Sequence, residues 1–280
     1  MSDYTQGINE HYGSVDLCAR IVAAVRAAGL DPARVTRDNL GTFDEFHSGG
    51  RPSTRELARL AGLNAEMAVL DAGCGVGGPA RTLAAEFGCR VTGLDLTEQF
   101  CRAAEMLTGW VGLAGRVSFR CGNALDMPFD AESFDLVWSQ NSMMNIEDKG
   151  RLFREVARVL RPGGLFAFEA VLAGPVPGIH LPTFWASSPA LNFLVPPGEV
   201  QALLAAAGFR VRDWIDRTAA GLERARERRA AIPDEAAAPL GRSAIVATDV
   251  AAKMANSARN AEEGHTIAVQ VVCVRGERSS

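Results

Sequence analysis

The sequence lacks the features that mark membrane-spanning, secreted and zinc-binding proteins. It contains no run of about 18 apolar residues that could cross a bilayer. Its first residues combine no basic segment with an apolar one, so we expect no secretory signal. None of the six cysteines belongs to a CxxC pair or has a histidine at zinc-ligand spacing. We therefore expect a soluble, cytoplasmic protein with reduced cysteines, no metal site and no membrane partner.

An excess of positive charge is also missing. The 29 Lys and Arg residues are outnumbered by 33 Asp and Glu residues, which gives a net charge of −4. A general nucleic-acid binder needs clustered basic residues against the phosphate backbone, so we expect no nucleic-acid partner. Hydrophobic residues make up 48% of the 280 positions, enough to bury a sizeable core. The composition indicates a globular protein and leaves a homodimer open.

Short apolar segments alternate with helical ones from residue 68 onward. The pattern predicts strands over 68–70, 90–94, 117–120, 134–138, 165–171, 209–215 and 266–274. It predicts helices over 79–87, 98–111, 149–160 and 199–207, and a helical segment over 218–262. This alternation is typical of an α/β fold, with a doubly wound, mostly parallel seven-stranded sheet that is covered on both faces.

The regions outside this alternation predict a helical cap. Residues 1–65 are expected to form an N-terminal cap, with one helix from Val15 to Ala28 and another from Thr54 to Ala61. Ser53 is expected to cap the second helix, with Glu56 completing a capping box. Residues 66–280 then form the main domain. Its insertions 173–197 and 218–262 are expected to join the cap over the carboxyl ends of the strands.

A glycine-rich turn after the first strand points to a nucleoside ligand. It runs from Asp71 to Pro79, and Asp95 ends the second strand 24 residues after Asp71. Glycines let the backbone approach a ligand closely, and a carboxylate placed like Asp95 reaches the hydroxyls of a ribose. Three glycines of the turn also satisfy GxGxxG, so an NAD-dependent oxidoreductase stays open, as does a nucleoside sensor without enzyme activity. The carboxylate of Asp71 would repel a pyrophosphate but would attract a ligand that carries an ammonium and a sulfonium. The alternative is that Asp71 only accepts hydrogen bonds from backbone N–H groups of the turn.

These motifs resemble those of class I S-adenosylmethionine-dependent methyltransferases. The similar segments are 69–79, 134–138 and 160–164; the resemblance covers about 65–172 strongly and 197–217 weakly. Segments 93–97 and 140–149 are most similar to the branch with sarcosine and dimethylglycine N-methyltransferases and the sterol and tocopherol enzymes. The resemblance implies a Rossmann-like sheet and S-adenosyl-L-methionine as the cofactor.

The resemblance also implies which residues bind the cofactor. The methionine part is assigned to Asp71, Ala72, Gly73 and Gly75, the ribose and adenine to Asp95, Leu96, Asn123 and Ala124, and the region near the sulfur to Ser139 and Gln140. Asn123 stands where the family commonly has Asp; its side-chain oxygen can still accept from the adenine amino group. Asn141 stands where related N-methyltransferases often have His, which puts a base at that place in doubt.

The expected reaction is direct displacement of the methyl group by a nucleophile of a small-molecule acceptor. The methyl group is already activated, so catalysis needs mainly alignment and exclusion of water. N-methylation of an amine is the favoured reaction, and O- or C-methylation remains open. His47 and His180 are the candidate catalytic bases, because both lie on expected covers of the pocket, and His11 lies in the N-terminal segment. Phe184, Trp185 and Phe193 are the aromatic candidates for a lid over the acceptor.

Overall fold

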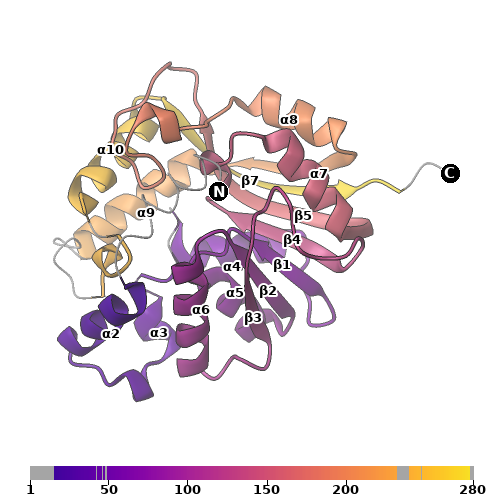
Figure 1. Cartoon of the computed structure of the whole chain (residues 1–280). Helices are drawn as coiled ribbons and strands as arrows, with labels where there is room; N and C mark the ends of the chain where they lie inside the picture. Colours follow the sequence, from indigo (N-terminus) through magenta and orange to yellow (C-terminus); the bar gives the residue numbers. More distant parts are fainter. Residues whose placement is uncertain are drawn as a thin grey trace.

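Seven strands form one sheet in the order β3-β2-β1-β4-β5-β7-β6 (Figure 1). The computed structural model describes residues 16–41, 43–45, 47, 49–231, 240–246 and 248–277. The strands are β1 (Ala68–Ala72), β2 (Arg90–Asp95), β3 (Val117–Cys121), β4 (Phe134–Gln140), β5 (Leu160–Ala173), β6 (Phe209–Asp216) and β7 (Thr266–Arg275). All neighbours pair in parallel except β7, which runs antiparallel to both β5 and β6. The predicted mostly parallel, seven-stranded sheet is confirmed.

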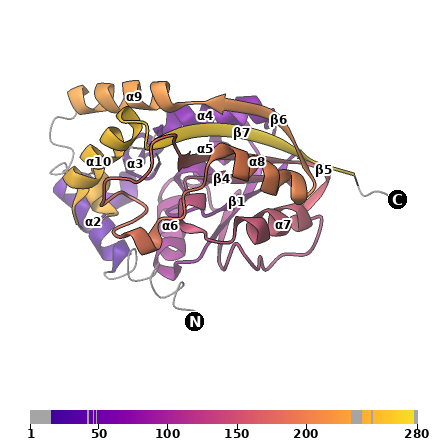
Figure 2. The ribbon, with the colours of Figure 1, turned by 90° about the horizontal axis from the view of Figure 1, so that it is seen from above.

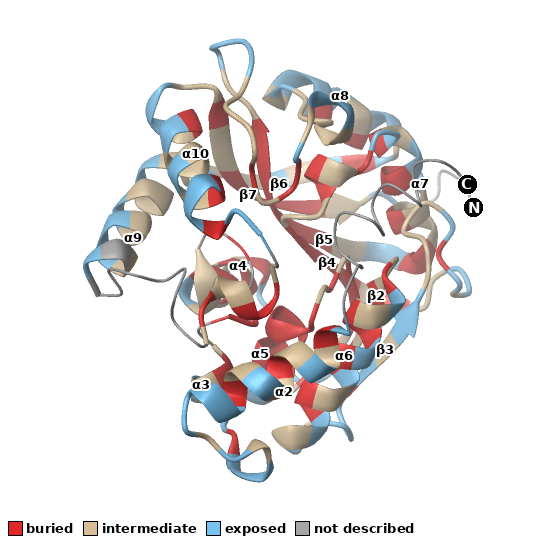
Figure 3. Ribbon diagram, turned by 60° about the vertical axis from the view of Figure 1, so that its left-hand side comes forward, coloured by how far each residue is buried: buried red, intermediate tan, exposed pale blue. Residues whose placement is uncertain are grey.

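Helices cover both faces of this sheet. One face is covered by α4 (Gly50–Ala61), α5 (Gly78–Phe87) and α6 (Glu98–Trp110), the other by α7 (Lys149–Val159) and α8 (Pro197–Ala206). Buried residues concentrate in the central strands and on the inner sides of these helices, as Figure 3 shows. The two layers follow from right-handed crossovers that run in opposite directions from β1 and β4. The helices and strands thus have the Rossmann-like arrangement that the sequence indicated.

Further helices gather at the carboxyl edge of the parallel strands. They are α2 (Leu17–Ala27), α3 (Arg37–Leu40), α9 (Thr218–Ala231) and α10 (Val250–Glu262), with the short turns η1 (Pro32–Arg34), η2 (Met143–Asn145), η3 (Pro189–Leu191) and η4 (Arg242–Ala244). Figures 1 and 2 both show α2, α9 and α10 at this side of the sheet. The position is a consequence of connectivity, because α9 follows β6 and α10 precedes the antiparallel β7.

The start of α4 corrects one prediction. The helix begins at Gly50 with Gly49 as its N-cap, so the capping box at Ser53 and Glu56 is wrong. Ser53 lies inside the first turn, and its buried hydroxyl hydrogen-bonds with Glu169 on β5 instead of with the helix backbone. α4 also packs directly on the sheet through Leu57 and its neighbours, although its residues belong to the expected N-terminal cap. A strand neighbour, not the local pattern, therefore decides what the Ser53 hydroxyl binds.

The parts of the expected cap that lie at 1–15 and 232–239, including His11, fall outside the described residues. In the described ranges no helix is both long and apolar enough to cross a lipid bilayer.

Candidate functional site

A cavity of about 310 Å³ opens at the carboxyl edge of the sheet. Its walls come from the turn after β1, the ends of β2 and β4, the loop after β3, the insertion after β5, and helices α9 and α10. The acidic lining residues are Asp44, Asp71 and Asp95, whereas three arginines come from α9 and η4. The cavity therefore combines an acidic wall on the first two strands with a basic wall on the covering helices.

The turn after β1 needs glycine at two places. Gly73 has φ +79°, and a Cβ added there would lie 2.4 Å from the Cβ of Ser142. A Cβ added at Gly78 would lie 2.1 Å from the backbone oxygen of Asp44, which crosses the start of α5. Larger residues at these positions would push apart the segments that form the cavity wall.

Asp71 places an unusual carboxyl group in the cavity wall. The residue is 1% exposed, and Oδ2 has no hydrogen-bond partner among the described residues. Burial raises the pKa of Asp71 to about 8, with Glu45 and Asp95 adding to the rise, while the charge of His47 and a hydrogen bond from the Ala80 backbone oppose it. A buried carboxyl oxygen without a hydrogen-bond partner favours a cationic donor from a ligand. Such a donor would form the missing hydrogen bond and stabilise the negative charge of the carboxylate.

Asp95 accepts hydrogen bonds from two loops of the cavity wall, the turn after β1 and the loop after β2. Its Oδ2 accepts from the backbone N–H of Gly75 at 2.9 Å, and its Oδ1 accepts from that of Thr97 at 2.9 Å. Burial raises the pKa of Asp95, and these two N–H groups oppose the rise. Each carboxylate oxygen has a second lone pair, so Asp95 can accept further hydrogen bonds from a ligand in the cavity.

Eight of the ten predicted cofactor residues line the cavity: Asp71, Gly73, Gly75, Asp95, Leu96, Asn123, Ala124 and Gln140. Ala72 and Ser139 are not among the lining residues. They lie on the neighbouring strands β1 and β4, where the Ser139 hydroxyl donates to the Ala72 carbonyl at 2.9 Å. Asn123 uses its side-chain oxygen to accept from the Leu125 N–H at 2.8 Å. That bond closes a turn and leaves a second lone pair for a ligand.

His47 lines the cavity as part of a buried charged network. Its Nε2 lies 3.0 Å from Glu45 Oε2, and its Nδ1 lies 3.4 Å from Glu169 Oε1. Burial lowers the pKa of His47, but hydrogen bonds to Glu169 and Glu45 outweigh burial and raise the pKa to about 9. The imidazole is therefore protonated at neutral pH and already donates to both carboxylates. In this state His47 cannot accept a proton from a substrate.

His180 lies away from the cavity. It is absent from the lining residues, and its Nε2 lies 2.7 Å from Glu263 Oε2 at the end of α10. The insertion nevertheless reaches the cavity through Phe184 and Trp185, whereas Phe193 does not line it. Trp185 is 6% exposed. Its Nε1 donates to Asn192 at 2.9 Å, so Trp185 both faces the cavity and anchors the insertion.

The sequence analysis did not predict the basic wall of the cavity. Arg224 and Arg228 line the cavity, as does Arg242 of η4, whose guanidinium lies 5.0 Å from the centre of the Phe184 ring. Arg224 also pairs with Glu56 at 2.6 Å. A helical signal was present, because the residues of α9 that line the cavity recur three or four positions apart: Thr218, Gly221, Leu222, Arg224, Ala225 and Arg228.

Comparison with known proteins connects this site to one family. Residues 70–168 match the family described as "Methyltransferase domain". The chain is similar to the O-methyltransferase resE of Aspergillus sclerotiorum, with 34% identity over 58% of this chain and 62% of that protein. It is also similar to a sarcosine/dimethylglycine N-methyltransferase of Halorhodospira halochloris, with 35% identity over 47% of this chain and 52% of that protein. The chain thus spans about half to three-fifths of the length of these curated relatives.

A solved structure matches over almost the whole chain. It is that of the geranyl diphosphate C-methyltransferase from Streptomyces coelicolor A3(2), with a TM-score of 0.70 and 22% identity. The match covers 98% of each chain. At this identity the likeness concerns the fold, which agrees with the sheet order and the covering helices.

Proposed function

We propose that the chain is a class I S-adenosylmethionine-dependent methyltransferase that methylates a small molecule, because residues 70–168 match the methyltransferase domain and the similar proteins include methyltransferases. The observation that carries the proposal is that Oδ2 of Asp71, in the wall of the cavity, has no hydrogen-bond partner among the described residues. The cofactor carries an ammonium group and a sulfonium, and the buried carboxyl fits such cationic groups. A dinucleotide fits poorly, because its pyrophosphate would meet the acidic wall.

The remaining cofactor residues have distinct roles in this proposal. Asp95 would hold the ribose hydroxyls, Leu96 would pack on the adenine, and Asn123 with Ala124 would face the adenine edge. When bound, the cofactor supplies a methyl group on a positively charged sulfur that is ready for displacement. Gln140 would line the pocket near that sulfur, and Ala72 and Ser139 would support it from behind through their mutual hydrogen bond.

We propose that the covering segments exclude water and align the acceptor. These segments are the N-terminal region 1–65 and the insertions 173–197 and 218–262. Their lining side chains include the apolar Trp185, Leu222 and Met254. A well-aligned pair of reactants can lower a barrier by about 7–11 kcal/mol without an acid or base from the protein. Such a mechanism suits a site in which His47 is protonated and His180 lies elsewhere.

N-methylation of an amine is the finer proposal. A neutral amine has its own lone pair and needs no strong base, whereas a hydroxyl usually does. The arginines of α9 and η4 would repel a simple cation and favour an acceptor that also carries an anionic group. The curated relatives include both an N- and an O-methyltransferase, so the acceptor atom needs a direct test.

Two experiments test the proposal. Isothermal calorimetry compares S-adenosylmethionine, S-adenosylhomocysteine and NAD, and we expect only the first two to bind. Transfer of a labelled methyl group is then measured with a panel of amines, amino acids, phenols and apolar acids. Tighter binding of NAD would refute the methyltransferase proposal, and tight cofactor binding without transfer to any acceptor would favour a nucleoside sensor.

A further inference from the structure

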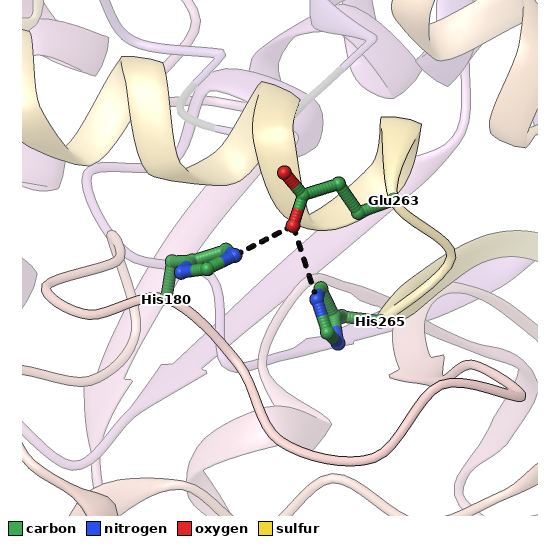
Figure 4. Close-up of side chains that lie close together, drawn as sticks. All are labelled: His180, Glu263 and His265. Carbon is green, nitrogen blue, oxygen red and sulfur yellow. Dashed lines mark hydrogen bonds and ion pairs between the residues drawn. The ribbon is translucent and has the colours of Figure 1, made fainter.

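Two histidines and a glutamate lie close together, as Figure 4 shows, and none of them lines the cavity. His180 comes from the insertion after β5, Glu263 from the end of α10, and His265 from the residue before β7. Glu263 Oε2 lies 2.7 Å from His180 Nε2 and 3.3 Å from His265 Nε2. One carboxylate oxygen thus faces two imidazole nitrogens, and all three atoms are potential metal ligands.

A buried asparagine holds the two histidines in place. The side chain of Asn260 is fully buried; it accepts from the His180 N–H at 2.7 Å and donates to the His180 carbonyl at 3.0 Å. The backbone carbonyl of Asn260 accepts from the His265 N–H at 2.8 Å. Both histidines are therefore fixed to one residue of α10, so their meeting depends on a rigid scaffold and not on mobile side chains alone.

Outer hydrogen bonds orient two of the three side chains toward a common point. Nδ1 of His265 lies 3.1 Å from the carbonyl oxygen of Pro177 and 3.3 Å from that of Val176. A proton on Nδ1 satisfies these carbonyls, and in the neutral imidazole it leaves the lone pair of Nε2 facing the carboxylate. Such a pair of acceptors is repulsive unless a cation lies between them.

The carboxylate is oriented in the same way. Arg259 Nε donates to Oε1 of Glu263 at 2.7 Å, which leaves Oε2 for the histidines. Metal-binding histidines and carboxylates in proteins are held by outer partners of these kinds.

We propose that His180, Glu263 and His265 bind one divalent transition-metal ion, and zinc is the ion that fits best. Two imidazoles and one carboxylate suit zinc and its neighbours, whereas magnesium and calcium prefer oxygen ligands alone. Zinc–nitrogen bonds of about 2.0–2.1 Å in a tetrahedron place two ligand atoms roughly 3.3 Å apart. The distance from Glu263 Oε2 to His265 Nε2 already has this value, and the distance from Glu263 Oε2 to His180 Nε2 would lengthen by about 0.6 Å to admit the metal. The side chains of His180 and Glu263 are 31% and 42% exposed, so water can complete the coordination.

The metal would tie together three segments that surround the cavity. The insertion carries Trp185, α10 carries Ala261, and β7 begins at Thr266, and all three residues line the cavity. None of the three ligand residues lines it, so the site is separate from the proposed cofactor site. Metal binding would therefore stabilise the arrangement of these three segments around the cavity. This proposal does not depend on which reaction takes place in the cavity.

The test uses the full chain without a polyhistidine tag, stripped of metal by a chelator. Zinc is titrated by calorimetry and by competition with a chromogenic chelator, and cobalt(II) is added separately to report the ligand types by its visible spectrum. The variants are His180→Ala, His265→Ala and Glu263→Gln. Glu262→Gln is the matched control, because Glu262 is the adjacent carboxylate and pairs with Arg226 at 3.3 Å instead.

The expected result is one zinc ion per chain and a higher melting temperature with zinc. Each ligand variant should weaken zinc binding at least tenfold, and Glu262→Gln should bind like the wild type. The cobalt spectrum should show tetrahedral or five-coordinate nitrogen and oxygen ligation, which gives a reading even if a variant folds poorly. The proposal is overturned if the wild type binds no zinc at 100 µM, if the ligand variants bind as tightly as the wild type, or if cobalt shows thiolate charge-transfer bands from a cysteine site.

Discussion

Binding of S-adenosylmethionine is expected to weaken about tenfold when the pH falls from 7 to 6, because Asp71 must lose a proton to pair with the ligand. The pKa of Asp71 is raised to about 8, mainly by burial. With this pKa, the Asp71 carboxyl is ionised in about one-tenth of the ligand-free molecules at pH 7 and in about one-hundredth at pH 6. Only the ionised fraction is ready for the ligand, so the apparent Kd rises by the same factor, which corresponds to about 1.4 kcal/mol per pH unit.

The sign follows from the direction of the pKa shift. Because the pKa of Asp71 is raised, acid stabilises the neutral form of the free protein, and the ligand must displace that proton. Binding at pH 7 should therefore release about 0.9 proton to the solvent, as expected for a carboxyl that is about nine-tenths protonated before binding. The ammonium group of the ligand, with a pKa of about 7.7–8.0, is about 80–90% charged at pH 7 and almost fully charged at pH 6, so it offsets only a small part of the effect.

Calorimetry in two buffers of different ionisation enthalpy measures the released protons, and titrations at pH 6, 6.5 and 7 measure the slope. Asp71→Asn is the matched variant, because it keeps the shape of the side chain and removes the titrating group. The variant should bind more weakly, release no proton and show a flat pH profile, while circular dichroism confirms its fold. If the wild type and the variant release equal numbers of protons and share one pH profile, Asp71 does not contact the cationic part of the ligand.

Three further changes test other parts of the site. Asp95→Ala should weaken cofactor binding at least tenfold, because charge-assisted hydrogen bonds of about 1.5–3 kcal/mol each are lost; an unchanged Kd by calorimetry would show that Asp95 does not hold the ribose. His47→Ala should lower the free energy of unfolding by about 3–5 kcal/mol, since it leaves the buried carboxylates of Glu45 and Glu169 without their cation; a melting temperature within one degree of the wild type would contradict this role. In the wild type the stabilisation from His47, whose pKa is raised to about 9, is fully present below pH of about 6.5 and is lost as the pH rises through 9, so chemical denaturation should give lower stability at pH 9.5 than at pH 7. Trp185→Ala should lower the stability by about 3–5 kcal/mol and raise KM for the acceptor; a raised KM at unchanged melting temperature would show a substrate contact without an anchoring role.

Local patterns in the sequence predicted most of the sheet and half of the site. The strands and helices follow from the spacing of apolar residues, which each segment carries by itself. The turn from Asp71 to Gly78 and the carboxylate of Asp95 were predictable for a related reason. Both lie at the ends of adjacent strands in one β-α-β unit, so their closeness is set by a short stretch of chain.

Other features depend on residues that are far apart in the chain. Ser53 has the sequence context of a helix cap, yet its hydroxyl binds Glu169, which lies 116 residues later. His47 is a plausible base by position, yet the same glutamate and Glu45 hold its proton. The environment of a buried polar group decides its charge and its bonds, and that environment is assembled only when β5 packs against α4.

The sequence by itself determined the fold class, the resemblance to methyltransferases and the acidic wall of the cavity, because each is encoded in contiguous motifs. Only the tertiary structure decided that Arg224 and Arg228 turn toward the cavity and that His180 meets Glu263, which lies 83 residues away. The physical reason is the sheet order: β6 ends and the antiparallel β7 begins at the carboxyl edge, so α9 and α10, which connect them, lie over that edge. The spacing of residues within α9 and α10 does not predict where these helices pack. The basic wall and the histidine–glutamate cluster therefore exist only in the folded chain.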